Sequence, residues 1–352
     1  MGWFSGDELK DAGFDLSDGS EFRRARIYFS GEVPGGYYFK AEYEFAGGVG
    51  TEDIRPIFTD VYMGKKDVVG SGDLQVGHFK EPFGLEALTS ANYLTFMERG
   101  SPEALVPFRN DGLMLAGTMA SERATWAVGV FRANTDNAGF SSEDGGYAGT
   151  GRLTYAPIYA RDGERVLHVG VDYSRRDLDG ARYRSRPEAH LLPNFIDTGT
   201  LDIDDLDLYD VELAGVLGPF SAQGEYILAS SSGGTDADFA GWYVEASYFL
   251  TGEHRPYELP TGAFGRVIPD RPAGGGEGGR GAWQVAARVS SLDFEEPGVS
   301  TGKLDGATLG LNWHLNSNMR IMFNYGISNV DDDAVPVDDS SSAFMIRLQA
   351  DW

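Results

Sequence analysis

The stretch YYFKAEYEF, residues 37–45, alternates strictly between two kinds of side chain. Aromatic or small apolar residues occupy every second position from its first residue to its last, and the charged residues Lys40, Glu42 and Glu44 stand between them. Successive side chains of a β-strand point to opposite faces, so this stretch predicts a strand with one apolar and one charged face. A soluble β-sandwich would bury the apolar face against a second sheet, whereas a membrane barrel would turn it toward lipid.

The composition excludes several classes of protein. The 352 residues include no cysteine, which excludes disulfide frameworks and thiolate metal sites. No stretch approaches about 18 consecutive apolar residues, so a spanning helix is not expected. The formal charge of -25 argues against nucleic acid as a partner, because phosphate binding needs a basic surface. The 48 glycines and 12% aromatic residues are typical of a β-rich chain, and a closed barrel is the remaining way through a bilayer.

The alternation recurs along the whole chain and predicts about fifteen strands, most with the roughly 9–11 residues of a tilted membrane strand. They are expected at 22–31, 37–46, 54–64, 73–80, 111–120, 123–132, 147–157, 165–175, 206–216, 219–230, 239–251, 281–292, 305–315, 318–329 and 341–352. Bacterial single-chain barrels have an even number of strands, so MGWF at the start is expected to end a truncated first strand. MGWFSGDELK has neither the basic start nor the apolar core of a signal peptide, so the numbering is expected to begin inside a mature or trimmed protein.

The connections between the predicted strands are alternately short and long. The tight ones are 33–36, 121–122, 217–218 and 316–318, and the long ones are 81–110, 133–146, 176–205, 293–304 and 330–340. Outer-membrane barrels combine short periplasmic turns with longer extracellular loops. The last strand is therefore expected to run toward the periplasm.

These patterns predict an all-β fold, a single transmembrane antiparallel β-barrel of sixteen strands over residues 1–352. The barrel is expected in the outer membrane of a Gram-negative bacterium, in contact with lipid and lipopolysaccharide. Its lipid-facing residues would include Tyr37, Phe39, Ala41, Tyr43 and Phe45, with Lys40 on the lumen side. A soluble all-β protein is the alternative.

Six stretches carry a resemblance to a known family. They are GSEFRRARIYFSG (19–31), YYFKAEYEFAGG (37–48), LQVGHFKEPFGLEALTS (74–90), LTFMERGSPEAL (94–105), LTGEHRPYE (250–258) and GAWQVAARVSSLDF (281–294). In these stretches, above all in FKEPFGLE followed by TFMER, the chain resembles the phosphate-selective porin O and P family of Gram-negative outer membranes. The resemblance implies a sixteen-stranded barrel, usually a homotrimer, that passes small inorganic anions such as phosphate or polyphosphate. It also implies that the third extracellular loop and inward-folded segments narrow the pore.

Two connections are expected to fold inward on the strength of their own sequences. Residues 81–110 contain PFGLE and TFMER, which are too apolar for a loop in water, so this loop is expected to pack inside the barrel. Residues 252–280 fall where a short periplasmic turn is due, yet this stretch is long and rich in proline. It is expected to fold inward or to cover the periplasmic mouth.

Basic side chains on the lumen face are the candidates for contact with a permeating anion, because the charges that line a pore set its ion selectivity. The candidates on strands are Arg24, Arg26, Lys40, Arg152, Arg288, Arg320 and Arg347, and those in or beside the third loop are Lys80, Arg99 and Arg109. A basic track past this loop is predicted from Arg24, Arg26, Lys40, Arg99 and Arg109. Arginine matches phosphate geometry better than lysine does. The alternative is that these bases neutralise acidic residues on neighbouring strands.

The charge of the third loop leaves the selectivity open. It carries Glu81, Glu86, Glu98 and Glu103 against Arg99 and Arg109. A passive porin for small anions is the first hypothesis, and a general or cation-preferring diffusion porin is the alternative. A structural or adhesive barrel, served by long acidic loops such as 201–210, is less favoured.

Enzymatic and metal-binding functions are not expected. A barrel hydrolase needs a nucleophile beside a base. His168 and Asp172 share a strand face, but four residues at about 3.3 Å each separate them by about 13 Å, too far to pair or to share a metal. DIDDLD, residues 202–207, lacks the glycine and the closing glutamate of a calcium loop. No cofactor and no metal site are therefore predicted.

Overall fold

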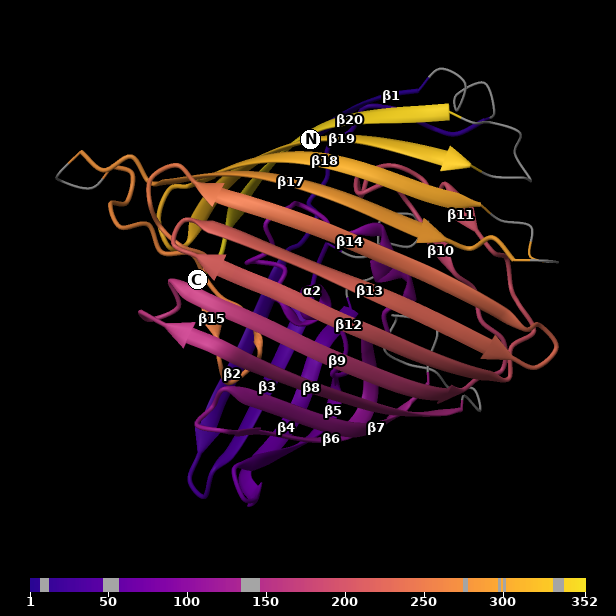
Figure 1. Cartoon of the computed structure of the whole chain (residues 1–352), viewed down its shortest axis with the longest axis horizontal. Helices are drawn as coiled ribbons and strands as arrows, with labels where there is room; N and C mark the ends of the chain where they lie inside the picture. Colours follow the sequence, from indigo (N-terminus) through magenta and orange to yellow (C-terminus); the bar gives the residue numbers. More distant parts are fainter. Residues whose placement is uncertain are drawn as a thin grey trace.

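The protein is an antiparallel β-barrel. The computed structural model describes residues 1–6, 13–46, 57–133, 146–274, 278–296, 299, 302–331 and 339–352. Within these residues, sixteen strands form one antiparallel sheet in chain order, and the first strand is hydrogen-bonded to the last. The sheet curves round a lumen that contains the short helix α2 (Figure 1). No helix of the described residues is long and apolar enough to cross a membrane.

The bounds of the elements are as follows. The sheet consists of β1 (Gly2–Ser5), β2 (Arg26–Val33), β3 (Tyr37–Glu44), β4 (Ile57–Val69), β5 (Gly72–Lys80), β6 (Arg109–Met119), β7 (Ala124–Arg132), β8 (Tyr147–Ala160), β9 (Arg165–Asp177), β12 (Asp205–Leu217), β13 (Phe220–Ser232), β14 (Ala237–Phe249), β17 (Ala282–Asp293), β18 (Lys303–His314), β19 (Met319–Asp331) and β20 (Asp339–Ala350). The connections contain α2 (Leu85–Leu88), the 3-10 helix η1 (Ser101–Leu105) and the hairpins of β10 (Arg184–Ser185) with β11 (Ile196–Asp197) and of β15 (Tyr257–Glu258) with β16 (Ala263–Phe264).

The sixteen-stranded barrel predicted from the alternation is confirmed. Each of the fifteen predicted segments contains a strand, and β1 lies in the MGWF stretch that was expected to end a truncated first strand. The largest difference is β4, which continues to Val69 where the prediction ended at residue 64. The two short hairpins of the connections were not predicted, because two residues are too few for a periodicity.

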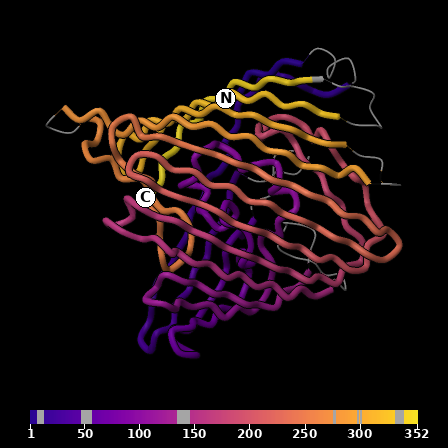
Figure 2. Tube along the Cα trace, viewed as in Figure 1, coloured from indigo at the N-terminus to yellow at the C-terminus, as the bar shows by residue number. Residues whose placement is uncertain are grey.

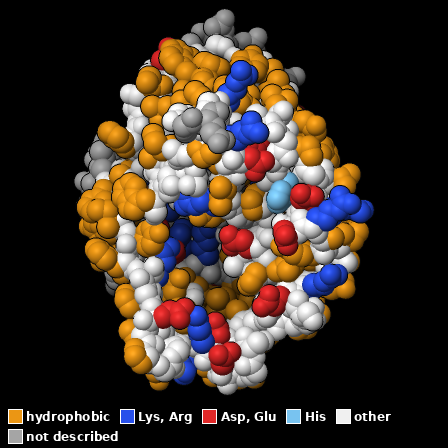
Figure 3. Space-filling view, turned by 90° about the vertical axis from the view of Figure 1, so that its left-hand side faces the viewer, with side chains coloured by type: hydrophobic (Ala, Val, Ile, Leu, Met, Phe, Trp, Pro, Cys, Tyr) orange, Lys and Arg blue, Asp and Glu red, His pale blue; other side chains and the backbone are white. Residues whose placement is uncertain are grey.

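The two faces of the sheet differ as the alternation requires. On β3 and just beyond it, Tyr37, Phe39 and Phe45 are exposed on the outside, while Glu42 and Glu44 are buried on the lumen side. The pairing of β3 with β4 shifts register between residues 41 and 43, which marks a β-bulge. Many large hydrophobic side chains of the strands are exposed, as a lipid-facing wall requires, and hydrophobic side chains gather around the rim of the barrel in Figure 3.

Short turns and long connections separate to opposite ends of the barrel. At one end, residues 34–36, 70–71 and 218–219 close tight turns, and Gly35 and Gly36 adopt φ angles of +91° and +75° that favour glycine. The C-terminus lies at this same end (Figure 2). The exception there is the 250–281 connection, which is long. Its β15–β16 hairpin packs inward against β8, β9 and β12, as expected, while another part projects from the barrel as an orange trace in Figure 2.

Candidate functional site

The connection from β5 to β6, residues 81–108, crosses the lumen and is hydrogen-bonded to the opposite side of the barrel. This inner loop donates from Gly84 N to Asp172 at 2.6 Å. It accepts from Asn312 Nδ2 and Arg320 Nη1, both at 2.7 Å, through the carbonyl oxygens of residues 95 and 94. Its apolar side chains, including Phe83 and Phe96, are 1% exposed. The loop therefore divides the lumen and narrows it.

Every glutamate of the inner loop is ion-paired with an arginine. The pairs are Glu81–Arg176 at 2.9 Å, Glu86–Arg288 at 3.1 Å, Glu98–Arg23 at 2.9 Å, Glu98–Arg347, and Glu103–Arg99 at 3.0 Å. Burial opposes the ionisation of Glu98, but the guanidinium groups of Arg23 and Arg347 outweigh it and hold its pKa well below the usual range. The glutamates therefore anchor the loop, and their charge is compensated locally.

A cavity of about 1030 Å³ lies beside the inner loop, between the β2–β6 wall and the connection 178–204. Its lining contains eleven basic side chains, Arg23, Arg24, Arg26, Lys40, Lys80, Arg99, Arg109, Arg176, Arg182, Arg184 and Arg186, and five acidic ones, Glu42, Asp60, Glu98, Glu103 and Glu188. The whole chain has 29 basic and 54 acidic residues. The lining therefore reverses the charge balance of the chain. A view onto the short-turn end shows basic side chains deep in the central hollow (Figure 3).

Four cations of the lining have no carboxylate within ion-pair distance among the residues that the structure describes: Arg24, Lys80, Arg184 and Arg186. Lys80 donates to the carbonyl of Ala87, and Arg186 donates to the carbonyl of His190 at 2.7 Å. Burial, together with the neighbouring Arg23, lowers the pKa of Arg24. A partly desolvated positive charge of this kind is stabilised by an anion.

Three other predicted residues line the cavity with a carboxylate beside them. Arg26 contacts Glu44 at 2.6 Å, while Lys40 and Arg109 both contact Asp60 at 2.6 Å. This is the cross-strand neutralisation that the sequence left open as the alternative. At these positions the bases are paired with carboxylates and still line the cavity.

Arg99 serves mainly to hold the inner loop. Its guanidinium donates to the carbonyl oxygens of residues 86 and 89 at 2.9 and 3.1 Å, and it stacks on Phe108 with 5.0 Å to the ring centroid. Its side chain is buried, with 7% exposed. It borders the cavity, but its donors are already committed to the loop backbone.

The other four predicted residues do not border this cavity in the described structure. Arg152 holds Glu212 at 2.8 Å and the carbonyl of residue 262 at 2.9 Å, which ties the β15–β16 hairpin to the wall. Arg288, Arg320 and Arg347 donate to backbone carbonyls of the inner loop. Their strand positions predicted the lumen face but not the loop that covers them.

Five arginines of the lining were not among the predicted residues: Arg23, Arg176, Arg182, Arg184 and Arg186. Three of them belong to RYRSR, residues 182–186, in the connection between β9 and β12. The prediction considered only strand parity and the third loop. A basic run inside an inward-lying connection was the signal that could have found them.

His168 is not arranged for nucleophilic catalysis. Its Nδ1 contacts the Tyr257 hydroxyl at 2.7 Å and its Nε2 contacts Glu212 at 2.8 Å. The partners of its ring nitrogens are therefore a tyrosine hydroxyl and a carboxylate, and not a serine or threonine hydroxyl.

Comparison with known proteins agrees with this architecture. The sequence model of the family described as phosphate-selective porin O and P matches residues 2–352. The chain belongs to this family. Members of the porin O and P family are outer-membrane porins of Gram-negative bacteria, which gives the barrel its location and its short-turn end a periplasmic orientation.

Relatives and solved structures extend the comparison. Porin O of Pseudomonas aeruginosa is 27% identical over 95% of this chain and 82% of its own length. An uncharacterised protein of Caulobacter vibrioides is 31% identical over 89% of this chain, and the match spans 63% of that protein. OprB of Pseudomonas putida has a similar fold, with a TM-score of 0.58, 12% identity, and coverage of 98% of this chain and 95% of that one.

Proposed function

We propose that this porin is a passive diffusion channel for small inorganic anions, with phosphate and short polyphosphates as the preferred class. The observation that carries the proposal is the lining of the cavity, with eleven basic against five acidic side chains in a chain of net charge -25. Charge at a narrow, low-dielectric passage acts on a passing ion more strongly than charge on loops in salt water. The cavity therefore dominates the selectivity.

An anion would meet several basic groups. The same cavity wall presents Arg182, Arg184 and Arg186 from the connection 178–204 and Arg24 and Lys80 beside the inner loop. Guanidinium groups offer paired N–H donors that match two oxygens of one phosphate, and no single group holds the anion on its own. Several weak sites in a row let an ion enter and also leave.

Three alternatives have less support. The hypothesis of a cation-preferring pore was based on the negative charge of the four glutamates of the inner loop. Each of these glutamates is ion-paired with an arginine. A hydrolase would need a nucleophile beside a base, whereas His168 contacts the Tyr257 hydroxyl and Glu212. An adhesive barrel would not require a basic cavity behind an inner loop. We accordingly propose a channel without enzymatic activity.

The assembly is part of the same proposal. Family membership supports a homotrimer embedded in outer-membrane lipid and lipopolysaccharide. The apolar outer surface fits lipid contact (Figure 3).

Planar bilayer recording tests the proposal. The reversal potential of the purified channel under a tenfold KCl gradient is expected to have the sign of chloride permeation, and millimolar phosphate is expected to reduce the chloride current. A reversal potential of the opposite sign would refute an anion channel. An anion-selective current that phosphate leaves unchanged would refute the phosphate preference alone.

A further inference from the structure

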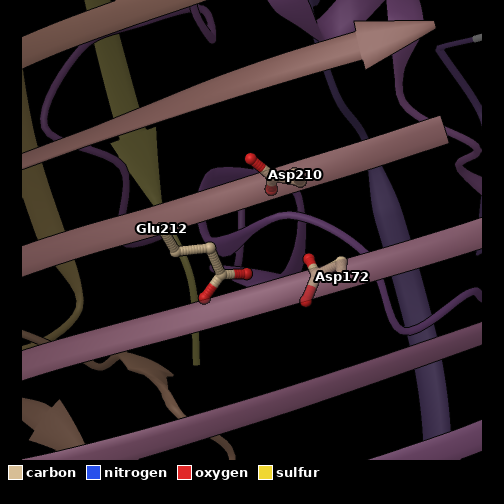
Figure 4. A group of neighbouring side chains, drawn as sticks. All are labelled: Asp172, Asp210 and Glu212. Atoms are coloured by element: carbon tan, nitrogen blue, oxygen red, sulfur yellow. The ribbon is translucent and has the colours of Figure 1, made fainter.

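Three carboxylates meet on the inner face of the wall that the inner loop covers. Asp172 of β9 stands directly opposite Asp210 of β12 in the strand register, and Glu212 lies two residues further along β12. One oxygen of each carboxylate lies within 4.8 Å of one oxygen of the other two. Their exposed fractions are 5%, 2% and 1%. Figure 4 shows the three side chains on adjacent strands, with Glu212 reaching toward Asp172.

The three carboxylates differ in how well they are satisfied. Glu212 accepts from Arg152 Nε and Nη2 and contacts His168 Nε2, each at 2.8 Å. Asp172 accepts from Gly84 N through Oδ2, but its Oδ1 has no hydrogen bond, and Arg152 Nε stands 3.6 Å away. Neither oxygen of Asp210 has a hydrogen-bond partner among the described residues. A buried charged carboxylate left without partners is destabilising.

The neighbouring side chains do not supply the positive charge that would compensate these carboxylates. Glu225 of β13 faces Glu212 across the strand pair and adds a fourth carboxylate. Its oxygens already accept from Leu85 N, Glu86 N and the Tyr243 hydroxyl. Arg152 is the guanidinium ion-paired with the group, and it is committed to Glu212. The free oxygens therefore face a surplus of negative charge, which a bound metal ion or a shared proton would offset.

We propose that Asp172, Asp210 and Glu212 bind a calcium ion between β9 and β12. Carboxylate oxygens are the ligands that hard divalent cations take. Calcium binds oxygen at about 2.3–2.6 Å, so two ligands on opposite sides of one ion lie up to about 5 Å apart, which covers the observed spread. Magnesium demands near-ideal octahedral geometry at about 2.0–2.1 Å, whereas calcium accepts irregular arrangements of oxygen ligands, so three carboxylates from two strands suit calcium better.

The bound ion links the wall to the inner loop. Asp172 would coordinate it through Oδ1 while its Oδ2 keeps the hydrogen bond from Gly84 N, at the start of α2. Calcium would therefore stabilise the docked position of the loop. None of the three carboxylates lines the large cavity, so the site is independent of the proposed anion pathway. The sequence predicted no metal site, because it compared residues along one strand and not across two.

The test begins with calcium content. Protein refolded without lipopolysaccharide and stripped with EDTA is titrated with CaCl2 at pH 8 and constant ionic strength, and bound calcium is counted by native mass spectrometry. About one ion per chain is expected for the wild type and none for Asp210→Asn. The matched control is Asp207→Asn on the same strand, a partly exposed carboxylate paired with Arg175 near the end of the strand, which should bind as the wild type does. No specific binding by the wild type, or equal binding by Asp210→Asn, would overturn the proposal.

A stability measurement adds a second readout. Calcium is expected to raise the apparent Tm of the wild type and of Asp207→Asn by several degrees, with a smaller rise for magnesium. In EDTA, Asp210→Asn should be at least as stable as the wild type, because it removes an uncompensated buried charge, and calcium should leave its Tm unchanged. An equal rise with magnesium would refute the choice of calcium. A wild type that is insensitive to both metals and is stabilised only by lowering the pH would show that protons occupy the site.

Discussion

Two walls of the same barrel face one lumen and use their charges differently. The wall of β2–β6 borders the open cavity, where Arg26 and Lys40 keep 27% and 22% of their side chains exposed. The wall of β9–β17 carries five inward acids, Asp172, Asp210, Glu212, Glu225 and Glu245, and each is at most 5% exposed. The inner loop lies against the second wall and covers it. Position relative to this loop, more than the charge of the chain, therefore decides which residues an ion meets.

The largest effect is expected from breaking an ion pair of the covered wall. Arg288 is 1% exposed and pairs with Glu188 and with Glu86. Arg288→Gln would leave buried carboxylates unpaired and should lower the free energy of unfolding by about 3–5 kcal/mol. Arg26→Gln on the open wall is the matched control and should cost about 1 kcal/mol. Urea unfolding in detergent compares the two, and equal losses would contradict the difference between the walls.

A middle-sized effect is expected where the covered wall holds the loop backbone. Glu225→Gln removes the carboxylate that accepts from Leu85 N and Glu86 N, and it should cost about 1–3 kcal/mol. Ion selectivity should stay unchanged, because Glu225 does not border the cavity. Glu42→Gln on the open wall should instead increase anion selectivity. Reversal potentials of both variants test this contrast, which fails if Glu225→Gln changes selectivity as much as Glu42→Gln.

The unpaired cations of the cavity should carry the anion preference. Replacing both Arg24 and Arg184 with Gln is expected to lower the chloride-to-potassium permeability ratio roughly three- to tenfold, because it removes two charges without carboxylate partners from the cavity lining. The control is Arg165→Gln, which removes an exposed charge at the short-turn end of β9 and should change the ratio little. Equal effects of the two changes would mean that the cavity has no special role.

The smallest effect is expected from the salt concentration, which should change the chloride-to-potassium permeability ratio only modestly. The Debye length falls from about 10 Å at 0.1 M to about 3 Å at 1 M, so raising KCl over this range should lower the permeability ratio by about twofold. The loss should be smaller than for a channel whose selectivity comes from its loops. A ratio that reaches unity at 1 M KCl would place the selecting charges on the exposed surface.

The fold was predictable because a strand in a membrane wall repeats one physical constraint every two residues. Glu42 and Glu44 could be assigned to the lumen from their parity alone. The inward course of the inner loop followed from its apolar residues, such as Phe83 and Phe96.

The site was less predictable because it depends on pairings across strands. From the sequence, Glu98 was expected to add negative charge to the pore. In the structure, Arg23 and Arg347, which are distant in sequence, form ion pairs with it and compensate its charge. Asp172 and Asp210 are 38 positions apart in numbering, and only the register of β9 with β12 brings them together. Parity gives the face that a residue occupies, but not what covers that face.

The anchors of the inner loop impose an order on assembly. The loop lies between β5 and β6, early in the chain, yet its contacts include Arg288, Arg320 and Arg347 on strands near the end, up to 250 residues away in sequence. These partners emerge last during synthesis and are positioned only when the final strands join the sheet. Contacts of such long range form slowly. The anchors from β17, β19 and β20 can therefore form only once the wall is complete, so an unfinished barrel would hold its inner loop through earlier strands such as β9 and β13, and a fully fixed constriction would mark a finished one.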